Sequence, residues 1–411
     1  MKSSAMIIML FCLIFGSAAT TRVAGSGATV PAAYQADIAR LIEGLKSPNA
    51  VERAAAACKL GEMGESAAPA ISHLIRLLGD ETPVKAFDCG RGRNTIQNDD
   101  DTVGLEAAVA LSRIGPLALD PLVLVLKTQE VPARKNATFA LGLMKDDRTV
   151  EPLLAAITDQ AGQVRAQAAW GLGLKHDSRA VEPLINALKD AEWEVRSQAA
   201  WASGLVGNSN SVEPLSVALR DSHARVRSQA AWALGLKGNR DSVEPLMAAL
   251  KDSDAHVRSQ AAWALGLKGD SRAVEGLVDA LRDTDGHTRS QAAWALGLKG
   301  NKDAVEALMT ALKDSEAHVR SQAAWALGLK GDYRAVEELS AATKDANNSV
   351  RKQATWALGM ILMRDRRAAN MNIKIEADPN LDNDDDQSSE PNLNNLKMKN
   401  KAKTKAKDKD N

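Results

Sequence analysis

The chain has 411 residues, of which 45% are hydrophobic and 25% charged, and its 52 basic and 52 acidic residues give a formal net charge of zero. A balanced charge offers no basic face for a phosphate backbone, so we expect no nucleic-acid partner. Aromatic residues make up only 3% of the chain, and eight of them are tryptophans.

Residues 1–19 have the organisation of a secretory signal peptide. Lys2 is followed by the apolar run Ala5–Gly16 and by the small residues Ser17, Ala18 and Ala19. This pattern predicts cleavage near Ala19 and an exported protein, periplasmic or extracellular. The apolar run is short for a bilayer span, and a retained N-terminal anchor is the alternative. We expect no membrane span after cleavage.

Residues 32–128 read as divergent helix pairs. Ala32–Lys46 and Ala50–Leu60 have helical periodicity and form the first pair. A loop insertion at 81–102 then interrupts the pattern, which resumes with a helix at Val103–Ile114. Atypical terminal units are expected of a repeat array, because an end must cap the core against water.

Two cysteines, Cys58 and Cys89, would remain after signal cleavage. An exported compartment permits a disulfide, but sequence spacing does not bring their Cα atoms together. We predict two free cysteines, one in a helix core and one in a loop.

From residue 129 to 363 the sequence repeats every 31 residues. The segment Ser259–Gly269 recurs unchanged at Ser228–Gly238, Ser290–Gly300 and Ser321–Gly331. Within one unit, Ala273–Leu281 has a helical apolar stripe, and Thr288–Leu298 is a second helix rich in Ala and Leu. Helices of about a dozen residues each bury little alone, so a fixed period predicts stacked copies.

Four first helices contain a proline, which is tolerated only in a first turn. Each of these helices is therefore predicted to begin two or three residues before it. The prolines are Pro152, Pro183, Pro214 and Pro245.

The repeat pattern resembles a known family. Asp252–Gly266 has the form Asp-x-x-x-x-Val-Arg-x-x-Ala-Ala-x-Ala-Leu-Gly, and Arg179–Asp190 reads Arg-Ala-Val-Glu-Pro-Leu-x-x-Ala-Leu-Lys-Asp. Both halves resemble the HEAT-like repeats of the phycobilisome (PBS) lyase type. The resemblance implies an all-α fold, an α-solenoid wound as a right-handed superhelix of about ten two-helix repeats over residues 32–363. It also implies that the second helix of each repeat lines the concave surface.

Tryptophans occupy one position of every regular second helix. On a helical wheel, Val257, Ala261 and Leu265 define the buried side, and Trp263 lies almost opposite them, with Ser259, Gln260 and Leu267 nearby. Helices packed about 8–10 Å apart would hold successive indoles too far apart for ring-on-ring contact. The predicted concave binding face consists of Trp170, Trp201, Trp232, Trp263, Trp294, Trp325, Trp356, Gln198, Gln229, Gln260, Gln291 and Gln322.

Three interpretations of this row of tryptophans remain open. Exposed aromatics are enriched at binding hot spots, and an apolar stripe on a soluble protein usually marks a partner surface. Alternatively, each indole lies flat on a neighbouring repeat and seals the wall. Recent duplication would also copy the residue without any demand for it.

An arginine begins each second helix and faces the buried arc, where an isolated charge is very costly. Recurrent aspartates offer partners, so we predict a structural ladder of paired charges. Its members are Arg165, Arg196, Arg227, Arg258, Arg289, Arg320, Arg351, Asp190, Asp221, Asp252, Asp283, Asp314 and Asp345.

No metal site, cofactor or catalytic group is predicted. His256, His287 and His318 keep the 31-residue step, but residues one helix spacing apart should not converge on a metal, and we interpret them as surface residues. The acidic runs 99–101 and 382–386 lack the spacing of an EF-hand loop and read as solvated loops.

The segment 364–411 is predicted to be a disordered charged tail. After Ala377 it is rich in Asn, Asp and Lys and nearly free of apolar residues, so burial cannot offset the entropy of ordering it.

We therefore predict a monomeric, non-catalytic exported scaffold that binds a protein or another extended ligand in the concave groove. One alternative is an enzyme or enzyme-maturation subunit, similar to the phycobilin lyases or to deoxyhypusine hydroxylase. None of the six histidines is followed by Glu, so no ligand residue of the hydroxylase is carried over. A purely structural spacer is the other alternative.

Overall fold

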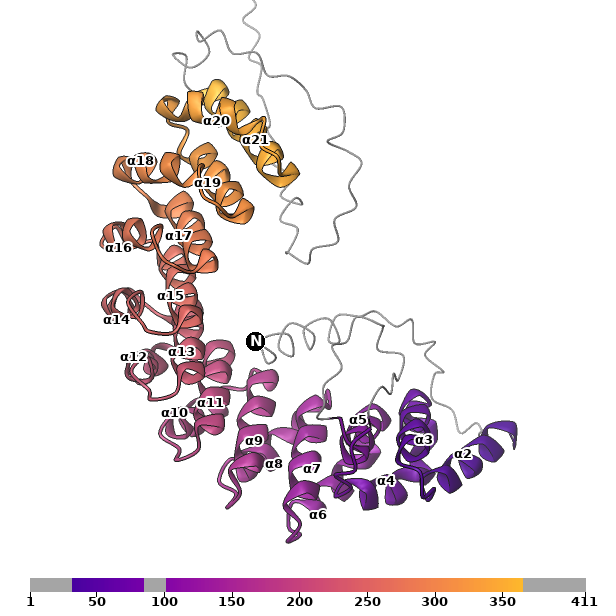
Figure 1. Cartoon of the computed structure of the whole chain (residues 1–411). Coiled ribbons are helices and arrows are strands. Elements are labelled where there is room, and N and C mark those ends of the chain that lie inside the picture. Colours follow the sequence, from indigo (N-terminus) through magenta and orange to yellow (C-terminus); the bar gives the residue numbers. More distant parts are fainter. Residues whose placement is uncertain (1–31, 85–100, 365–411) are drawn as a thin grey trace, which may run out of the picture. The chain divides into compact units, whose positions relative to one another are not determined.

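The computed structural model describes residues 32–84 and 101–364. Within these residues the chain forms ten consecutive helix pairs and no strand beyond one isolated β-bridge (Figure 1). The predicted signal peptide, most of the predicted loop insertion and all but the first residue of the predicted tail lie outside the described residues.

The first helices of the pairs are α2 (Ala32–Gly44), α4 (Ile71–Leu77), α6 (Leu119–Val125), α8 (Val150–Ala156), α10 (Val181–Ala187), α12 (Val212–Ala218), α14 (Val243–Ala249), α16 (Ala273–Ala280), α18 (Lys302–Ala311) and α20 (Val336–Ala342). The second helices are α3 (Ala50–Glu62), α5 (Val103–Ile114), α7 (Val131–Leu143), α9 (Gly162–Lys175), α11 (Trp193–Val206), α13 (Ala224–Lys237), α15 (Ala255–Lys268), α17 (Gly286–Lys299), α19 (Ala317–Lys330) and α21 (Asn348–Arg364).

Most first helices are shorter than the predicted dozen residues. A 3₁₀ segment precedes α4, α6, α8, α10, α12, α14 and α20, and each of these helices then runs for only seven residues. In the regular repeats an Asp or Asn starts the 3₁₀ turn; the Asp177 side chain, for example, accepts a hydrogen bond from the Arg179 amide. This local bond competes with α-helix formation. The α-helix begins two residues before Pro183, as predicted.

The second helices form the continuous layer of the array. Each packs most extensively against the second helix before and after it, while each first helix packs mainly on the second helix of its own pair (Figure 1). Val257, Ala261 and Leu265 are buried, as the helical wheel predicted. Small alanines at the remaining contact positions let successive helices approach closely.

The ends of the predicted insertion are joined to each other. Pro83 and Thr102 form an antiparallel bridge, the Val84 amide donates to the Asp101 carbonyl at 2.8 Å, and the Val103 amide donates to the Thr82 carbonyl at 3.1 Å. Val84 and Val103 pack in one buried cluster. The repeat frame therefore continues from α4 into α5.

Cys58 is disulfide-bonded, so the prediction of a free thiol at this position is wrong. Its partner lies outside the described residues. Spacing along the chain did not reveal this bond, because a disulfide depends on the distance between two Cα atoms, which the sequence alone does not give.

Candidate functional site

Four rows of side chains run across the second helices on the side turned away from the buried residues Val257, Ala261 and Leu265. We call this surface the second-helix face. In α15 the rows are represented by His256, Gln260, Trp263 and Leu267, spaced four, three and four residues apart, which places them on one side of a helix. The glutamines are half-buried, and leucines such as Leu236, Leu267 and Leu298 are 42%, 39% and 37% exposed. The face thus offers amide groups and apolar surface at every repeat.

Each indole of the tryptophan row lies against a glycine of the preceding repeat. A Cβ added to Gly235 would lie 2.6 Å from Cζ3 of Trp263, and one added to Gly266 would lie 2.8 Å from Cζ3 of Trp294. The same relation holds for the pairs Gly142–Trp170, Gly173–Trp201, Gly204–Trp232, Gly297–Trp325 and Gly328–Trp356. The tryptophans therefore connect neighbouring repeats as well as lining the face.

Exposure varies along the tryptophan row. Trp201 is buried, at 7% exposed, while Trp356 in the last described repeat is 39% exposed and the others are half-buried. At the other end, Phe139 occupies the equivalent position and its ring stacks on Trp170 at 5.1 Å between centroids. Ring-on-ring contact thus occurs at this step of the row, contrary to the expected spacing, because the second helices carry small residues between them.

The serines predicted on this face are buried instead. Ser197, Ser228 and Ser259 are 3%, 2% and 8% exposed. The single-helix wheel treated every position away from the first helices as open. In the array, neighbouring second helices cover that flank.

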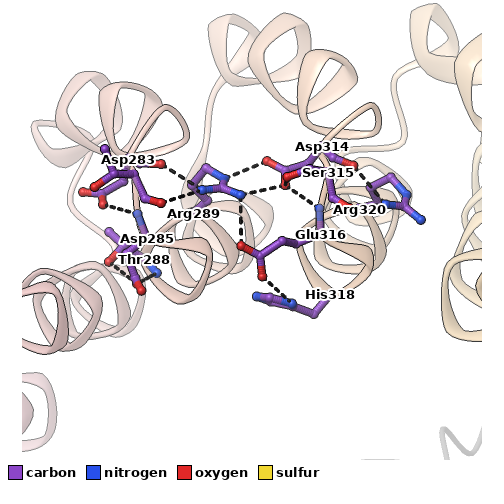
Figure 2. A network of polar contacts seen from close by, with 10 residues as sticks. Asp283, Asp285, Thr288, Arg289, Asp314, Ser315, Glu316, His318 and Arg320 are labelled. Atoms are coloured by element: carbon purple, nitrogen blue, oxygen red, sulfur yellow. Dashed lines mark hydrogen bonds and ion pairs between the residues drawn. The ribbon is translucent and has the colours of Figure 1, made fainter.

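The row at the N-terminal ends of the second helices is the variable one. It reads Gln163, Glu194, Arg225, His256, His287, His318 and Ser349. The histidines are exposed, as interpreted, but the rings of His287 and His318 come within 5.3 Å between centroids. The expected separation by a helix spacing was wrong for this pair, because the distance between packed helices does not fix the distance between the rings of their side chains. His318 also lies 3.5 Å from Glu316, which contacts Arg289 at 3.3 Å (Figure 2).

A hollow of about 610 Å³ opens on the second-helix face where α7, α9, α11 and α13 begin. Its lining is polar and mixed in charge, with Trp193 as its aromatic residue. The lining includes Glu81, Lys135, Glu192, Trp193, Glu194, Ser197 and Arg225. Trp193 is the one tryptophan outside the 31-residue row, and its ring stacks on His223 at 3.8 Å with 10° between the planes.

Arginines and aspartates form a continuous ladder along the turns between first and second helices. Nε and Nη2 of Arg258 each donate to one carboxylate oxygen of Asp283 at 2.7 Å, and Nη1 donates to the Asp252 carbonyl at 2.9 Å. Figure 2 shows the same arrangement around Arg289 and Asp314. The ion pairs at this spacing are Arg134–Asp159, Arg165–Asp190, Arg196–Asp221, Arg227–Asp252, Arg258–Asp283, Arg289–Asp314 and Arg320–Asp345. Arg351 donates to the Asp345 carbonyl at 3.1 Å.

The ladder lowers the pKa of its aspartates. For Asp283, burial disfavours the charged carboxylate, but the Arg258 hydrogen bonds, the Asp285 amide and the arginine charges outweigh it and hold the pKa below its usual value of 3.8. Asp190, Asp221, Asp252 and Asp314 are shifted in the same direction by the same kinds of contact.

These shifts predict acid-sensitive stability. A carboxylate with a lowered folded-state pKa binds fewer protons in the folded state than in the unfolded state, so its contribution is present above pH 4 or so and is lost as the pH falls further. We expect the free energy of unfolding, measured by urea titration, to be flat near pH 6 and to fall steeply below about pH 4. A profile that is flat down to pH 2 would contradict this origin of the stability.

Lysines at the ends of second helices join successive repeats. Nζ of Lys268 donates to the Gly238 carbonyl at 2.9 Å, and Nζ of Lys330 donates to the Gly300 carbonyl at 3.0 Å. Lys175 makes the equivalent bond to the Met144 carbonyl. Burial lowers the pKa of Lys175 to about 8, against the opposing charges of Asp146 and Asp147.

In residues 32–84 and 101–364, no three His, Cys, Asp or Glu side chains are grouped so that they could hold a metal ion. No helix in the same ranges is long and apolar enough to cross a membrane.

Stacked helix pairs with one continuous layer of second helices define an α-solenoid. The family model for HEAT repeats matches residues 150–221, 212–287, 274–359 and 319–370, and the model for the PBS lyase HEAT-like repeat matches residues 133–159. These matches cover more than half of the chain, and the chain belongs to the HEAT-repeat family.

The chain is similar to several solved structures. Importin β is 16% identical, with 81% of this chain and 51% of importin β covered and a TM-score of 0.51. An engineered protein is 22% identical, with 79% and 98% covered and a TM-score of 0.44. Human deoxyhypusine hydroxylase in complex with glycerol is 24% identical, with 60% and 96% covered and a TM-score of 0.29. The comparison with curated proteins found no match.

The sequence alone did not identify the glycine row, the Trp193–His223 stack or the hollow. The glycines carried a signal, since a helix-interior glycine follows every row tryptophan by three residues and costs helix stability. Trp193 carried another, as the one tryptophan out of frame. The hollow had no signal, because it depends on side chains from four helices.

Proposed function

We propose that the protein is an exported, non-catalytic scaffold that binds an extended polypeptide segment on the second-helix face. The observation that carries the proposal is the regular row of half-buried glutamines, one per repeat, beside exposed leucines. A side-chain amide has both donors and an acceptor, the same pair that a peptide group presents. Repeated amides therefore suit a ligand whose backbone repeats.

The tryptophans and leucines add apolar contact area to this row. Half-exposed indoles held against the preceding glycines are already ordered, so they lose little conformational freedom when a ligand binds. Export rests on the signal-peptide pattern of residues 1–19 and is supported by the disulfide at Cys58, since disulfides persist in oxidising compartments.

The test uses glutamines instead of tryptophans, because the indoles also pack between repeats. A random 12-residue peptide display library would be selected on the wild-type protein, and the selected peptides titrated by calorimetry. We expect the triple variant Gln229→Ala, Gln260→Ala, Gln291→Ala to keep its helical circular dichroism and to lose at least tenfold in affinity.

A matched control places three alanines on exposed positions of first helices: Glu213→Ala, Glu275→Ala and Glu337→Ala. This variant should bind the peptides as the wild type does. If no peptide is enriched, or if both triple variants bind equally well, the second-helix face is not a polypeptide-binding surface.

The enzyme and the structural spacer remain the alternative functions. A structural spacer would bind no peptide on the second-helix face. The glutamine variant would then behave like the wild type in every binding measurement. Among the described residues, no group of side chains favours a particular reaction, and we therefore propose the scaffold in preference to the enzyme.

A further inference from the structure

The hollow at the start of α7, α9, α11 and α13 differs from the rest of the array in how its charges are placed. Ladder charges are saturated by bidentate pairs, but Glu81, Lys135, Glu192, Glu194 and Arg225 make no side-chain hydrogen bond or ion pair within the described residues. All five line one cavity of about 610 Å³. These charged side chains line one hollow without an ion-pair partner, so they are available to bind a charged ligand.

One of these charged groups, Arg225, is costly to leave without a partner. Arg225 is half-buried, and burial lowers its pKa while the charge of Glu194 acts in the opposite direction. Ser197 also lines the hollow. A charge that is partly removed from water and has no ion-pair partner is costly, so Arg225 indicates a missing partner.

The hollow has two poles of opposite charge, one helix apart. At the start of α11, the consecutive residues Glu192, Trp193 and Glu194 all line the hollow, and two carboxylates with an aromatic ring suit an ammonium or guanidinium group. At α13, Arg225 suits a carboxylate. His223 holds these poles in place, because it stacks on Trp193 and its Nδ1 accepts the Arg225 amide hydrogen at 3.3 Å.

The spacing of the second helices favours one conformation of a polypeptide ligand. Packed helices lie about 8–10 Å apart. A polyproline II segment rises about 3.1 Å per residue with three residues per turn, so every third side chain returns to the same side after about 9 Å. One turn of such a ligand therefore matches one repeat of the array, and residues i and i+3 would meet adjacent second helices.

We propose that the hollow reads a pair of opposite charges, one basic and one acidic side chain three residues apart, on a polypeptide bound in the polyproline II conformation. The basic side chain binds between Glu192, Trp193 and Glu194, and the acidic side chain binds Arg225. This inference rests on the proposed polypeptide-binding function and adds the sequence preference of the ligand.

The test uses synthetic proline-rich 12-residue peptides that differ only in two side chains, Lys and Glu or Lys and Lys at positions i and i+3, titrated against the full chain. We expect the wild type to bind the Lys/Glu peptide at least tenfold more tightly than the Lys/Lys peptide. The variant Arg225→Glu makes both poles acidic and should reverse this preference. Reversal is a gain of binding, which a merely unfolded variant could not show.

The matched control is Arg220→Glu, the same substitution at an exposed position that follows the first helix α12 and does not line the hollow. It should leave the preference for the Lys/Glu peptide unchanged. If both peptides bind the wild type equally, or if Arg225→Glu does not reverse the order, the charge-reading role is wrong while the scaffold function stands. If neither peptide binds and the display library also yields none, both proposals fail.

Discussion

Replacing Arg258 with Met should lower the free energy of unfolding by about 3 kcal/mol, the lower end of the range for breaking a buried ion pair. The substitution leaves the Asp283 carboxylate, whose side chain is 11% exposed, without its bidentate partner. It also removes the donor to the Asp252 carbonyl. Urea unfolding followed by circular dichroism at pH 7 would measure the change.

Arg282→Met is the matched control for this prediction. Arg282 lies 4.0 Å from Asp279, and their side chains are 79% and 71% exposed. Exposed pairs contribute about 0–1 kcal/mol, so this variant should unfold almost as the wild type does. Equal losses from the two arginines would mean that the ladder does not stabilise the array more than a surface pair.

Replacing Gly266 with Ala should also destabilise the array, by about 1–3 kcal/mol, the usual cost of overpacking. The added methyl would lie 2.8 Å from Cζ3 of Trp294 and 2.9 Å from the Cα of Ala295. Because one of these atoms belongs to the backbone, a side-chain rotation alone cannot relieve the contact. The melting temperature and the tryptophan emission maximum would both report the change.

Gly359 provides an internal comparison, since it occupies the same repeat position in α21 and has nothing within 4 Å of an added Cβ. Gly359→Ala should be neutral or stabilise the helix by up to about 1 kcal/mol, the difference in helix propensity. A destabilisation equal to that of Gly266→Ala would show that the tryptophan–glycine contact is not the cause.

Much of the fold was predictable because the same local sequence pattern occurs in many repeats. The 31-residue step, the buried face through Val257, Ala261 and Leu265, and the start of α10 before Pro183 all follow from periodicity and backbone sterics. Each is a property of one helix or one turn. The match to the HEAT-repeat family confirms the fold class that these patterns predicted.

The candidate site was less predictable, because its geometry depends on how neighbouring repeats pack together. A helical wheel contains one helix, so it placed Ser259 on an open face that the adjacent helix in fact covers. It also gave no reason to link Trp263 with Gly235, which is 28 residues away. The distance between the rings of His287 and His318 depends on their side-chain conformations, which the spacing of the helices does not determine.

The double role of the ladder aspartates has a consequence for how the gene can change. Asp283 accepts Arg258 of the preceding unit with its carboxylate and Arg289 of its own unit with its backbone carbonyl. Removing or adding one complete 31-residue unit re-forms every such link with an identical partner, whereas a partial unit leaves two charges without counterparts. The array can therefore lengthen or shorten only in whole steps of 31 residues.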